Sequence, residues 1–373
     1  MRFGKKKTDY KYFWSISILA ITIVIGLWLV NWLVLNKYPN EVRGTHGDMF
    51  GAVNAIFSGF AFAGIIISLY LQRIDLKNQH QQLELNREEI KNTNKEFKIQ
   101  NDTLRIQQFE NQYYKMIDLH RANITDVKVP YLEVLESSSR SSAKSTITSN
   151  TQRRELTGKK VFVDMAKELE ICLKYSLVIL KSKNQKYKDS DIFHFAYKIF
   201  FWGINSEFIN SELISILDQK KVIELLRRKQ NDYKKDSSKP HEKGLKIRYI
   251  PFQGHESKLA HYYRHLFHTV RYVVDIEKSG LIDYYQARQY LRILRSQLSN
   301  AEQLMLYYNY ICSFGCEWDK NGKRGNMYFT DYRMIHNIPV GRVKFVDSPR
   351  KHFLKFIEWC CSENDPLFEW GDY

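Results

Sequence analysis

The sequence predicts a mainly α-helical membrane protein with an N-terminal two-helix transmembrane hairpin, a helical stalk and a helical cytosolic domain. Two long stretches without a charged residue, 12–36 and 49–72, lie near the N-terminus. Beyond them the chain is polar and highly charged, and hardly any strand-like alternation occurs before the last 50 residues. Aromatic residues make up 14% of the chain, so the polar part has enough material for a packed core.

The first uncharged stretch, residues 12–36, has the properties of a membrane-spanning helix. At about 1.5 Å per residue it is long enough to cross a hydrocarbon core of about 30 Å. Aromatic residues stand near both of its ends, as in the aromatic belts of membrane proteins. A signal peptide would have a shorter apolar region and a small-residue cleavage site. We therefore interpret residues 12–36 as an uncleaved transmembrane helix.

A Pro- and Gly-containing turn, Lys37–Asp48, leads to the second uncharged stretch, residues 49–72. The N-terminal tail is rich in Lys and Arg, which favours a cytosolic location for that tail. The chain would then return to the cytosol after Gln72. We expect residues 1–72 to form the membrane domain of a multi-pass protein with both termini in the cytosol.

The second stretch carries two distinct rows of residues. Ala55, Gly59 and Ala63 recur every four residues, which permits close helix–helix approach. A neighbouring face carries a polar stripe with helical spacing: Asn54, Ser58, Ala61, Ser68 and Gln72. A polar stripe is costly in lipid, so it should face another helix or water. Two interpretations stay open: the stripe binds the two helices of one hairpin together, or several hairpins assemble and the stripe lines a water-filled path.

Residues 73–108 are predicted to form a polar helical stalk. Every seventh residue in this region is apolar, as in one seam of a coiled coil: Leu76, Leu83, Ile90, Phe97 and Leu104. The positions three and four residues further along are polar, so the seam is weak by itself. The stalk either associates where the membrane helices bring copies together, or packs on the main domain.

The cytosolic domain, residues 109–373, begins with an aromatic segment and contains a Ser/Thr-rich loop at about 136–151. Helical periodicity predicts helices at 161–180, 191–216, 222–230, 259–276, 284–298 and 300–314. A basic connection occupies 231–254. Ser299 and Glu302 have the spacing of a capping box at the start of the last helix. The five cysteines show no paired framework and are expected to be reduced.

The sequence contains no motif that requires an enzyme or a cofactor. Phosphate-cradling and nucleophile-elbow motifs are absent. His261, His265, His268 and Asp275 share one helix face, which we interpret as a hydrogen-bonded polar face. A zinc site is the weaker alternative, because no further ligand is evident nearby. Neither a cofactor nor a metal is therefore expected.

Two segments carry a family resemblance. HYYRHLFHTVRYV at 261–273 and YLRILRSQLSNAEQLMLYYN at 290–309 resemble the putative phage abortive infection (AbiC-like) family of bacterial proteins. The matching residues are His261, Tyr262, Arg264, His265, Leu266, Arg295, Gln297, Leu298, Ser299, Glu302, Tyr308 and Asn309. That family often begins, after its membrane hairpin, with an aromatic segment that ends in a Leu-His pair, as FENQYYKMIDLHRANI does at 109–124. The resemblance carries over no catalytic residue and marks these positions as a structural or regulatory core.

The resemblance implies an antiphage effector in the bacterial inner membrane that kills or arrests the infected cell. We expect it to be a homo-oligomer that permeabilises the membrane and has no small-molecule substrate. Similar two-transmembrane proteins accompany some retrons, in which a reverse transcriptase with its RNA–DNA product inhibits the effector, and the resemblance implies a partner of that kind. The net charge of +16 favours anionic partners, although a basic surface without a specific ligand fits equally well.

Two alternatives stay open. One is a membrane-anchored HEPN-like RNase, because Arg264 and His268 resemble the Arg/His pair of such enzymes, although fewer residues separate them than is usual in those motifs. The other is a membrane-anchored sensor or scaffold whose hairpin serves only as an anchor.

Overall fold

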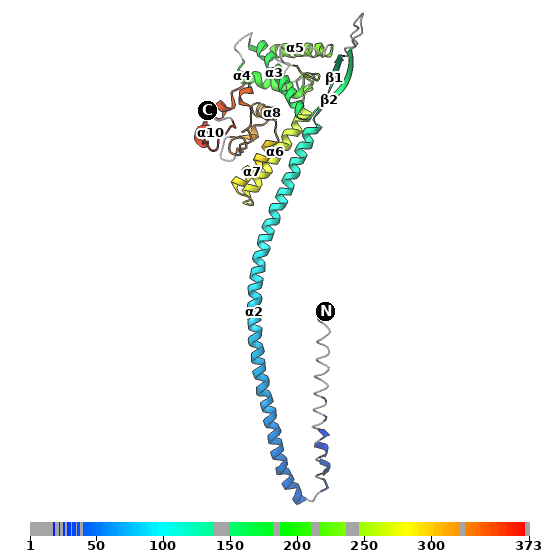
Figure 1. Cartoon of the computed structure of the whole chain (residues 1–373), viewed down its shortest axis with the longest axis vertical. Helices are drawn as coiled ribbons and strands as arrows, with labels where there is room; N and C mark the ends of the chain where they lie inside the picture. The colour runs from blue at the N-terminus through cyan, green and yellow to red at the C-terminus, as the bar shows by residue number, and fades with distance from the viewer. Residues whose placement is uncertain are drawn as a thin grey trace. The chain divides into compact units, whose positions relative to one another are not determined.

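A computed structural model of the chain describes single positions between 18 and 37 and the ranges 40–136, 149–181, 187–209, 217–235, 246–320 and 325–369. The chain divides into two compact units, Met1–Phe97 and Lys98–Tyr373, each of which is described by itself. The described part is mainly α-helical, as predicted (Figure 1).

Helix α2, Asn40–Asp126, has 87 residues and supplies most of the described part of the first unit. Pro39 directly precedes it in the sequence and the next proline is Pro130, so no proline interrupts its hydrogen-bond ladder. The turn predicted at Lys37–Asp48 was wrong in extent, because the helix already begins at Asn40. The predicted span at 49–72 and the stalk at 73–108 are consequently parts of one helix.

The predicted first membrane helix, residues 12–36, lies mostly outside the described residues. Its described positions from Ile18 to Val34 are helical, and the Thr22 hydroxyl donates a hydrogen bond to the Ile18 carbonyl (2.7 Å). Pairing between the two predicted membrane helices therefore stays a prediction.

The second unit contains a β-hairpin that the sequence analysis did not predict. Strands β1, Lys128–Glu136, and β2, Ser149–Thr157, pair antiparallel from Lys128↔Thr157 to Glu136↔Ser149. The loop predicted at about 136–151 is thus shorter than expected, and residues 137–148 lie outside the described part. Pro130 in β1 and the polar sequence SNTQRRELT of β2 obscure the alternation by which strands are recognised.

Three helices follow the hairpin. Helix α3, Lys159–Lys181, packs on α4, Asp189–Trp202, and on α5, Leu217–Lys235. Apolar residues with helical periodicity predicted a helix there, and many of them are buried. The helix predicted at 191–216 was too long, because α4 ends at Trp202. The helix predicted at 222–230 was too short, because α5 runs to Lys235 into the expected connection.

A backbone crossing holds the end of α4 against the chain just before α6. Gly203 and Gly254 both have positive φ, 85° and 89°. A Cβ on Gly203 would lie against the Gln253 carbonyl, and a Cβ on Gly254 against the Trp202 carbonyl. The Gly254 side of the crossing is fixed by hydrogen bonds from the His255 amide to the Phe201 carbonyl (2.8 Å) and from the Ile204 amide to the Phe252 carbonyl (3.1 Å). Only glycine fits either position.

Helices α6, Glu256–Lys278, α7, Tyr284–Ser296, and α8, Asn300–Ile311, lie close to their predicted positions. Helix α6 packs on α7 and α4, and α8 packs on α3 (Figure 1). The last part of the chain consists of short helices and turns: η2 Cys316–Trp318, η3 Val340–Arg342, α9 Pro349–His352 and α10 Leu354–Cys360.

The core of the second unit is strongly aromatic. Among the side chains of α2 whose burial the structure describes, Phe109 is the first buried one, at the position where the domain was predicted to begin. Its ring meets the Tyr290 ring of α7 edge-on, with centroids 4.9 Å apart. The Tyr113 hydroxyl donates to the Tyr290 carbonyl, so the C-terminal part of α2 is fixed to α7. The high Tyr and Phe content of the sequence is thereby used as packing material.

Candidate functional site

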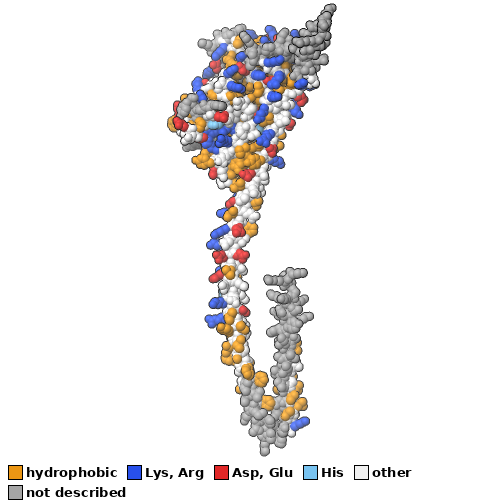
Figure 2. All heavy atoms as spheres, viewed as in Figure 1, with side chains coloured by type: hydrophobic (Ala, Val, Ile, Leu, Met, Phe, Trp, Pro, Cys, Tyr) orange, Lys and Arg blue, Asp and Glu red, His pale blue; other side chains and the backbone are white. Residues whose placement is uncertain are grey.

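The apolar part of α2 is exposed and could cross a membrane. Among the described residues, one helical segment is long and apolar enough to cross a membrane, and it begins at Phe57 of α2. Phe60, Phe62 and Ile65 are 58–70% exposed, and Figure 2 shows hydrophobic side chains along this part of the helix. Apolar surface of this kind calls for lipid or another protein segment to cover it.

The predicted polar stripe lies on one face of this segment. At about 100° per residue, Asn54, Ser58, Ser68 and Gln72 fall within an arc of about 80°, and all four are exposed. Asn54 and Gln72 are about 27 Å apart along the axis, close to the hydrocarbon thickness of about 30 Å. Ile65 falls within the same arc, so the stripe is interrupted by an apolar side chain between Ser58 and Ser68.

The row of small residues is centred about 140° around the helix from the polar stripe, at about 100° per residue. Ala55, Gly59 and Ala63 are exposed. A Cβ added at Gly59 would have no atom within 4 Å among the neighbours that the structure describes. Close approach of a second helix to this row stays a prediction.

The seam of the stalk is exposed along its whole length. Leu76, Leu83, Ile90, Phe97 and Leu104 are each at least half exposed. Leu104 belongs to the second unit, yet it is not packed against that unit. At this position the structure favours an available seam over a helix packed on the main domain.

In the second unit, three of the residues singled out in the sequence meet where α6 contacts the start of α8. The Tyr262 hydroxyl donates to Glu302 Oε1 (3.0 Å), and the Ser299 amide and hydroxyl donate to Glu302 Oε2 (2.8 and 2.6 Å). Tyr262 and Glu302 are buried. Burial, followed by the charge of Glu302, raises the pKa of Tyr262 well above its ordinary value, so the phenol remains a donor. The predicted capping box is confirmed, and this cluster has a structural role.

The histidine of the Leu-His pair joins the same core. The His120 ring lies 5.4 Å from the Tyr262 ring and 6.1 Å from the His265 ring, nearly parallel to the latter. His120 is completely buried, and neither of its nitrogens has a hydrogen-bond partner within the described residues. Burial, followed by the charges of His265 and neighbouring cations, lowers the pKa of His120 to about 4. Burial also lowers the pKa of His265. A stack of neutral rings therefore links α2 to α6.

Gln297 and Asn309 also connect separate elements. Gln297 Oε1 accepts a hydrogen bond from Arg121 Nη2 of α2 (3.0 Å). Asn309 Nδ2 donates to the Tyr197 hydroxyl of α4 (3.0 Å), and a Cβ on Gly315 would lie 2.5 Å from Asn309 Oδ1. Both residues hold the domain together.

The polar residues of α6 include the histidines and the Arg264/His268 pair singled out in the sequence. Within the described ranges, no three His, Cys, Asp or Glu side chains are grouped so that they could hold a metal ion. Arg264 lines an aromatic cavity of about 310 Å³ together with Phe267 and Trp318. His268 is not among the residues that line this cavity, so Arg264 and His268 do not converge on it.

Sequence reasoning missed two buried acidic residues of α3. Asp164 accepts hydrogen bonds from Arg248 Nε (2.8 Å) and the Arg248 amide (3.2 Å). Glu168 accepts from the Phe252 amide (2.7 Å) and contacts His255 Nε2 (2.9 Å). The hydrogen bonds to Asp164 raise the pKa of Arg248. The spacing of Asp164 and Glu168, one turn apart among apolar residues, was the sequence feature that could have identified them as buried carboxylates. Their hydrogen bonds hold segment 248–255 on α3.

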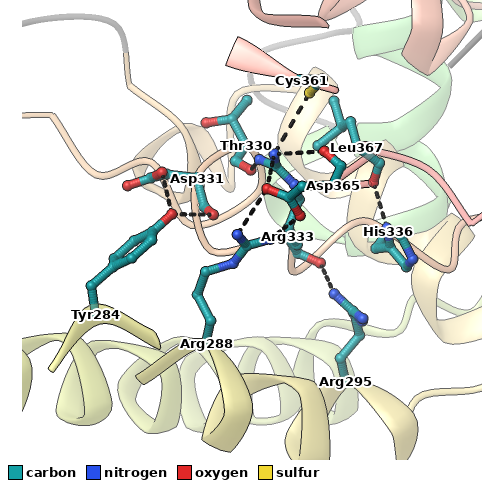
Figure 3. Close-up of polar contacts among 10 residues, drawn as sticks. All are labelled: Tyr284, Arg288, Arg295, Thr330, Asp331, Arg333, His336, Cys361, Asp365 and Leu367. Atoms are coloured by element: carbon teal, nitrogen blue, oxygen red, sulfur yellow. Dashed lines mark hydrogen bonds and ion pairs between the residues drawn. The ribbon is translucent and has the colours of Figure 1, made fainter. Parts of the chain in front are cut away.

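A cavity of about 400 Å³ lies between α7 and the C-terminal part of the chain (Figure 3). Arg288 forms a two-pronged ion pair with Asp365 (2.6 and 2.8 Å). Arg333 Nη2 donates to the same carboxylate (2.8 Å). Four arginines line this cavity, and of these only Arg295 was among the residues singled out from the sequence. The recurrence of arginine at 288, 292 and 295, on one face of α7, was the signal that could have found the site.

These features define a class: a mainly α-helical protein whose long helix carries a segment suited to a membrane and whose domain is organised around α6, α7 and α8. Residues 254–343 match the family described as putative phage abortive infection protein. The match spans these three helices, assigns this part of the chain to the AbiC-like family and confirms the resemblance found in the sequence. The match supports a role in antiphage defence in general. No curated protein and no solved structure matches the chain.

Proposed function

We propose that the protein is an antiphage effector that permeabilises the bacterial inner membrane during infection and acts without enzymatic chemistry. The observation that carries this proposal is the polar stripe of Asn54, Ser58, Ser68 and Gln72 on an otherwise apolar and uncharged segment of α2. Such residues are costly in lipid and usually face water or another helix. The family match supports the defence role.

In this proposal the two predicted membrane helices form a hairpin with both termini in the cytosol. The basic N-terminal tail supports that orientation. Copies associate through Ala55, Gly59 and Ala63, because small residues let helix backbones approach closely. The stripes of several copies then face a shared aqueous interior, and the exposed seam of the stalk aligns the copies.

A controlling partner keeps the copies apart before infection. The second unit carries many exposed Lys and Arg side chains, which Figure 2 shows on the visible face, and helix α5 contributes Lys220, Arg228, Lys234 and Lys235. A partner that contains nucleic acid, such as a reverse transcriptase with its RNA–DNA product, suits this charge.

The proposal is tested by inducing the full chain in a bacterium and following dye entry, membrane potential and total RNA. Dye entry should precede any loss of RNA. Asn54→Leu with Ser58→Leu should preserve insertion, because it makes the span more apolar, and should abolish dye entry. Phe60→Leu with Leu71→Ile, at positions that belong neither to the stripe nor to the row of small residues, is the matched control and should leave dye entry intact.

Gly59→Leu tests the assembly step separately. A large side chain in the row of small residues should prevent close helix approach, and should lower both the crosslinked oligomer size and dye entry. Full toxicity of all three variants at wild-type abundance would mean that the span is only an anchor. RNA cleavage that persists after deletion of residues 1–72 would support the RNase alternative instead.

A further inference from the structure

Three arginines of α7 line the cavity between α7 and the C-terminal part of the chain, and Figure 3 shows two of them, Arg288 and Arg295, pointing from α7 toward that part of the chain. Arg288, Arg292 and Arg295 are spaced by four and three residues, so they follow one another along the helix. Arg333 faces them from the opposite wall, and the two carboxylates that line the cavity are Asp365 and Glu369. Positive charge therefore exceeds negative charge in this cavity.

The fold places a guanidinium in the wall of the cavity at a conformational cost. Arg333 is only 4% exposed and has a φ of 58°, a left-handed conformation that long side chains seldom adopt. Its guanidinium donates to the Thr330 carbonyl and to Asp365. Hydrogen bonds from Arg288, followed by the charge of Arg333, hold the pKa of Asp365 below its ordinary value. Asp365 is thus fully engaged by Arg288 and Arg333.

Within the part of the chain that the structure describes, Arg295 forms no ion pair with a carboxylate, and Glu369 acts on it through its charge alone. It is 9% exposed, its Nη1 donates to the Arg333 carbonyl (2.7 Å), and its Nε has no hydrogen-bond partner within the described residues. Burial, followed by the charges of Arg292 and Arg288, lowers the pKa of Arg295 to about 10. Arg292 lies exposed at the rim, one turn away. A buried guanidinium among other cations, with a free N–H, calls for an anion.

We propose that this cavity binds the phosphate group of a nucleotide-sized soluble ligand, with Arg292 and Arg295 as the phosphate-binding residues. The planar guanidinium fork matches two phosphate oxygens. A volume of about 400 Å³ suits a small molecule and not a polymer. Tyr285, 75% exposed and lining the same cavity, offers an aromatic face for a base. That the ligand regulates membrane permeabilisation rests on the proposed function, whereas the binding does not.

Binding is measured on the full chain in phosphatidylcholine nanodiscs by equilibrium dialysis, with inorganic phosphate, AMP and ATP as probes. Wild type should bind AMP or ATP, and Arg292→Gln should weaken that binding about tenfold, since one charge-assisted interaction is lost. Arg271→Gln, which removes an exposed arginine of α6 outside the cavity, should leave the affinity unchanged. Arg295→Lys, which keeps the charge and loses the fork, should also weaken binding, with circular dichroism to verify the fold.

The other outcomes are decisive too. Phosphate that competes with AMP and requires Arg292 would support the site. Binding restricted to vesicles with phosphatidylglycerol, or to single-stranded RNA, with no binding of free nucleotides, would overturn the proposal. So would equal affinity of wild type and Arg292→Gln, or no binding at millimolar ligand. Nucleotide binding by a protein that never admits dye would contradict the proposed function and leave this site standing.

Discussion

At the residue scale, Glu302 shows how a buried carboxylate is accommodated without solvent. It accepts hydrogen bonds from the Ser299 amide, the Ser299 hydroxyl and the Tyr262 hydroxyl. The Ser299 amide could be predicted as a donor from the spacing of Ser299 and Glu302, which is that of a capping box, and the Ser299 hydroxyl is brought close to Glu302 by the same motif. The third could not, because Tyr262 lies on another helix and only packing brings it near.

Tyr262→Phe should lower the free energy of unfolding by about 1–3 kcal/mol, because a buried acceptor loses its donor while the packed ring is kept. Urea unfolding of the full chain in detergent, followed by near-ultraviolet circular dichroism, measures this change. Tyr285→Phe is the matched control, since Tyr285 is 75% exposed and should change stability by less than about 0.5 kcal/mol. Equal effects of both substitutions would contradict the role given to Tyr262.

His120 predicts a loss of stability in acid. Its pKa is lowered from 6.5 to about 4 in the folded chain, so between these values the unfolded chain binds a proton that the folded chain does not. Above pH 6.5, His120 should therefore not affect the free energy of unfolding. As the pH drops from 6.5 toward 4, the free energy of unfolding should fall by about 3 kcal/mol in total. His120→Phe should remove this part of the pH dependence.

Urea titrations of both proteins at several pH values between 7 and 4 measure the difference. His80→Phe, at an exposed position of α2, is the control and should leave the slope as in wild type. A His120→Phe protein with an unchanged acid slope would show that His120 titrates normally.

At the scale of elements, α2 combines an apolar segment, a polar stripe and an exposed seam in one uninterrupted helix. The stripe and the seam could be predicted because both depend on periodicity alone. The structure shows that α2 is one continuous helix, so the angular position of each residue around it can be calculated. This calculation places the apolar Ile65 within the polar stripe.

If the stripes line a water-filled path, Ile65 forms its narrow apolar part. Hydrophobic constrictions gate such paths by excluding water. Ile65→Ser should therefore increase dye entry and toxicity at equal abundance. Leu71→Ser, at a position outside both the stripe and the row of small residues, should have no such effect. Similar dye entry for both variants and wild type would remove Ile65 from the path.

Elements differed in how well the sequence predicted them. Helices α6, α7 and α8 were located closely because their apolar residues recur with helical spacing and a capping box marks one start. The β1–β2 hairpin was missed because its strands lack alternation. The pairs of Asp164 with Arg248 and of Glu168 with His255 were also missed, since their partners are distant in sequence. The arginine cavity required the C-terminal part of the chain to fold back onto α7, which no local pattern indicates.

At the scale of the whole molecule, the proposed topology follows from the basic N-terminal tail and the two uncharged stretches. Reporter fusions at either terminus and after Gln72 should report a cytosolic location. A tag inserted within 37–48 should be accessible from the periplasm. A tag there that is protected in intact cells, while a tag after Gln72 is accessible, would reverse the orientation, and protection of every site would exclude the hairpin.

The crossing of Gly203 and Gly254 has a consequence for tracing this protein across distant relatives. Each backbone occupies the space that a Cβ on the other would need, so a substitution at one position cannot be compensated at the other. The two glycines should be inherited together even where the surrounding sequence has diverged. Gly254 opens the segment that matches the family. Gly203 therefore supplies an alignment point in the preceding part of the chain, which the match does not reach, and a glycine that follows an aromatic helix upstream of the segment would identify the same domain.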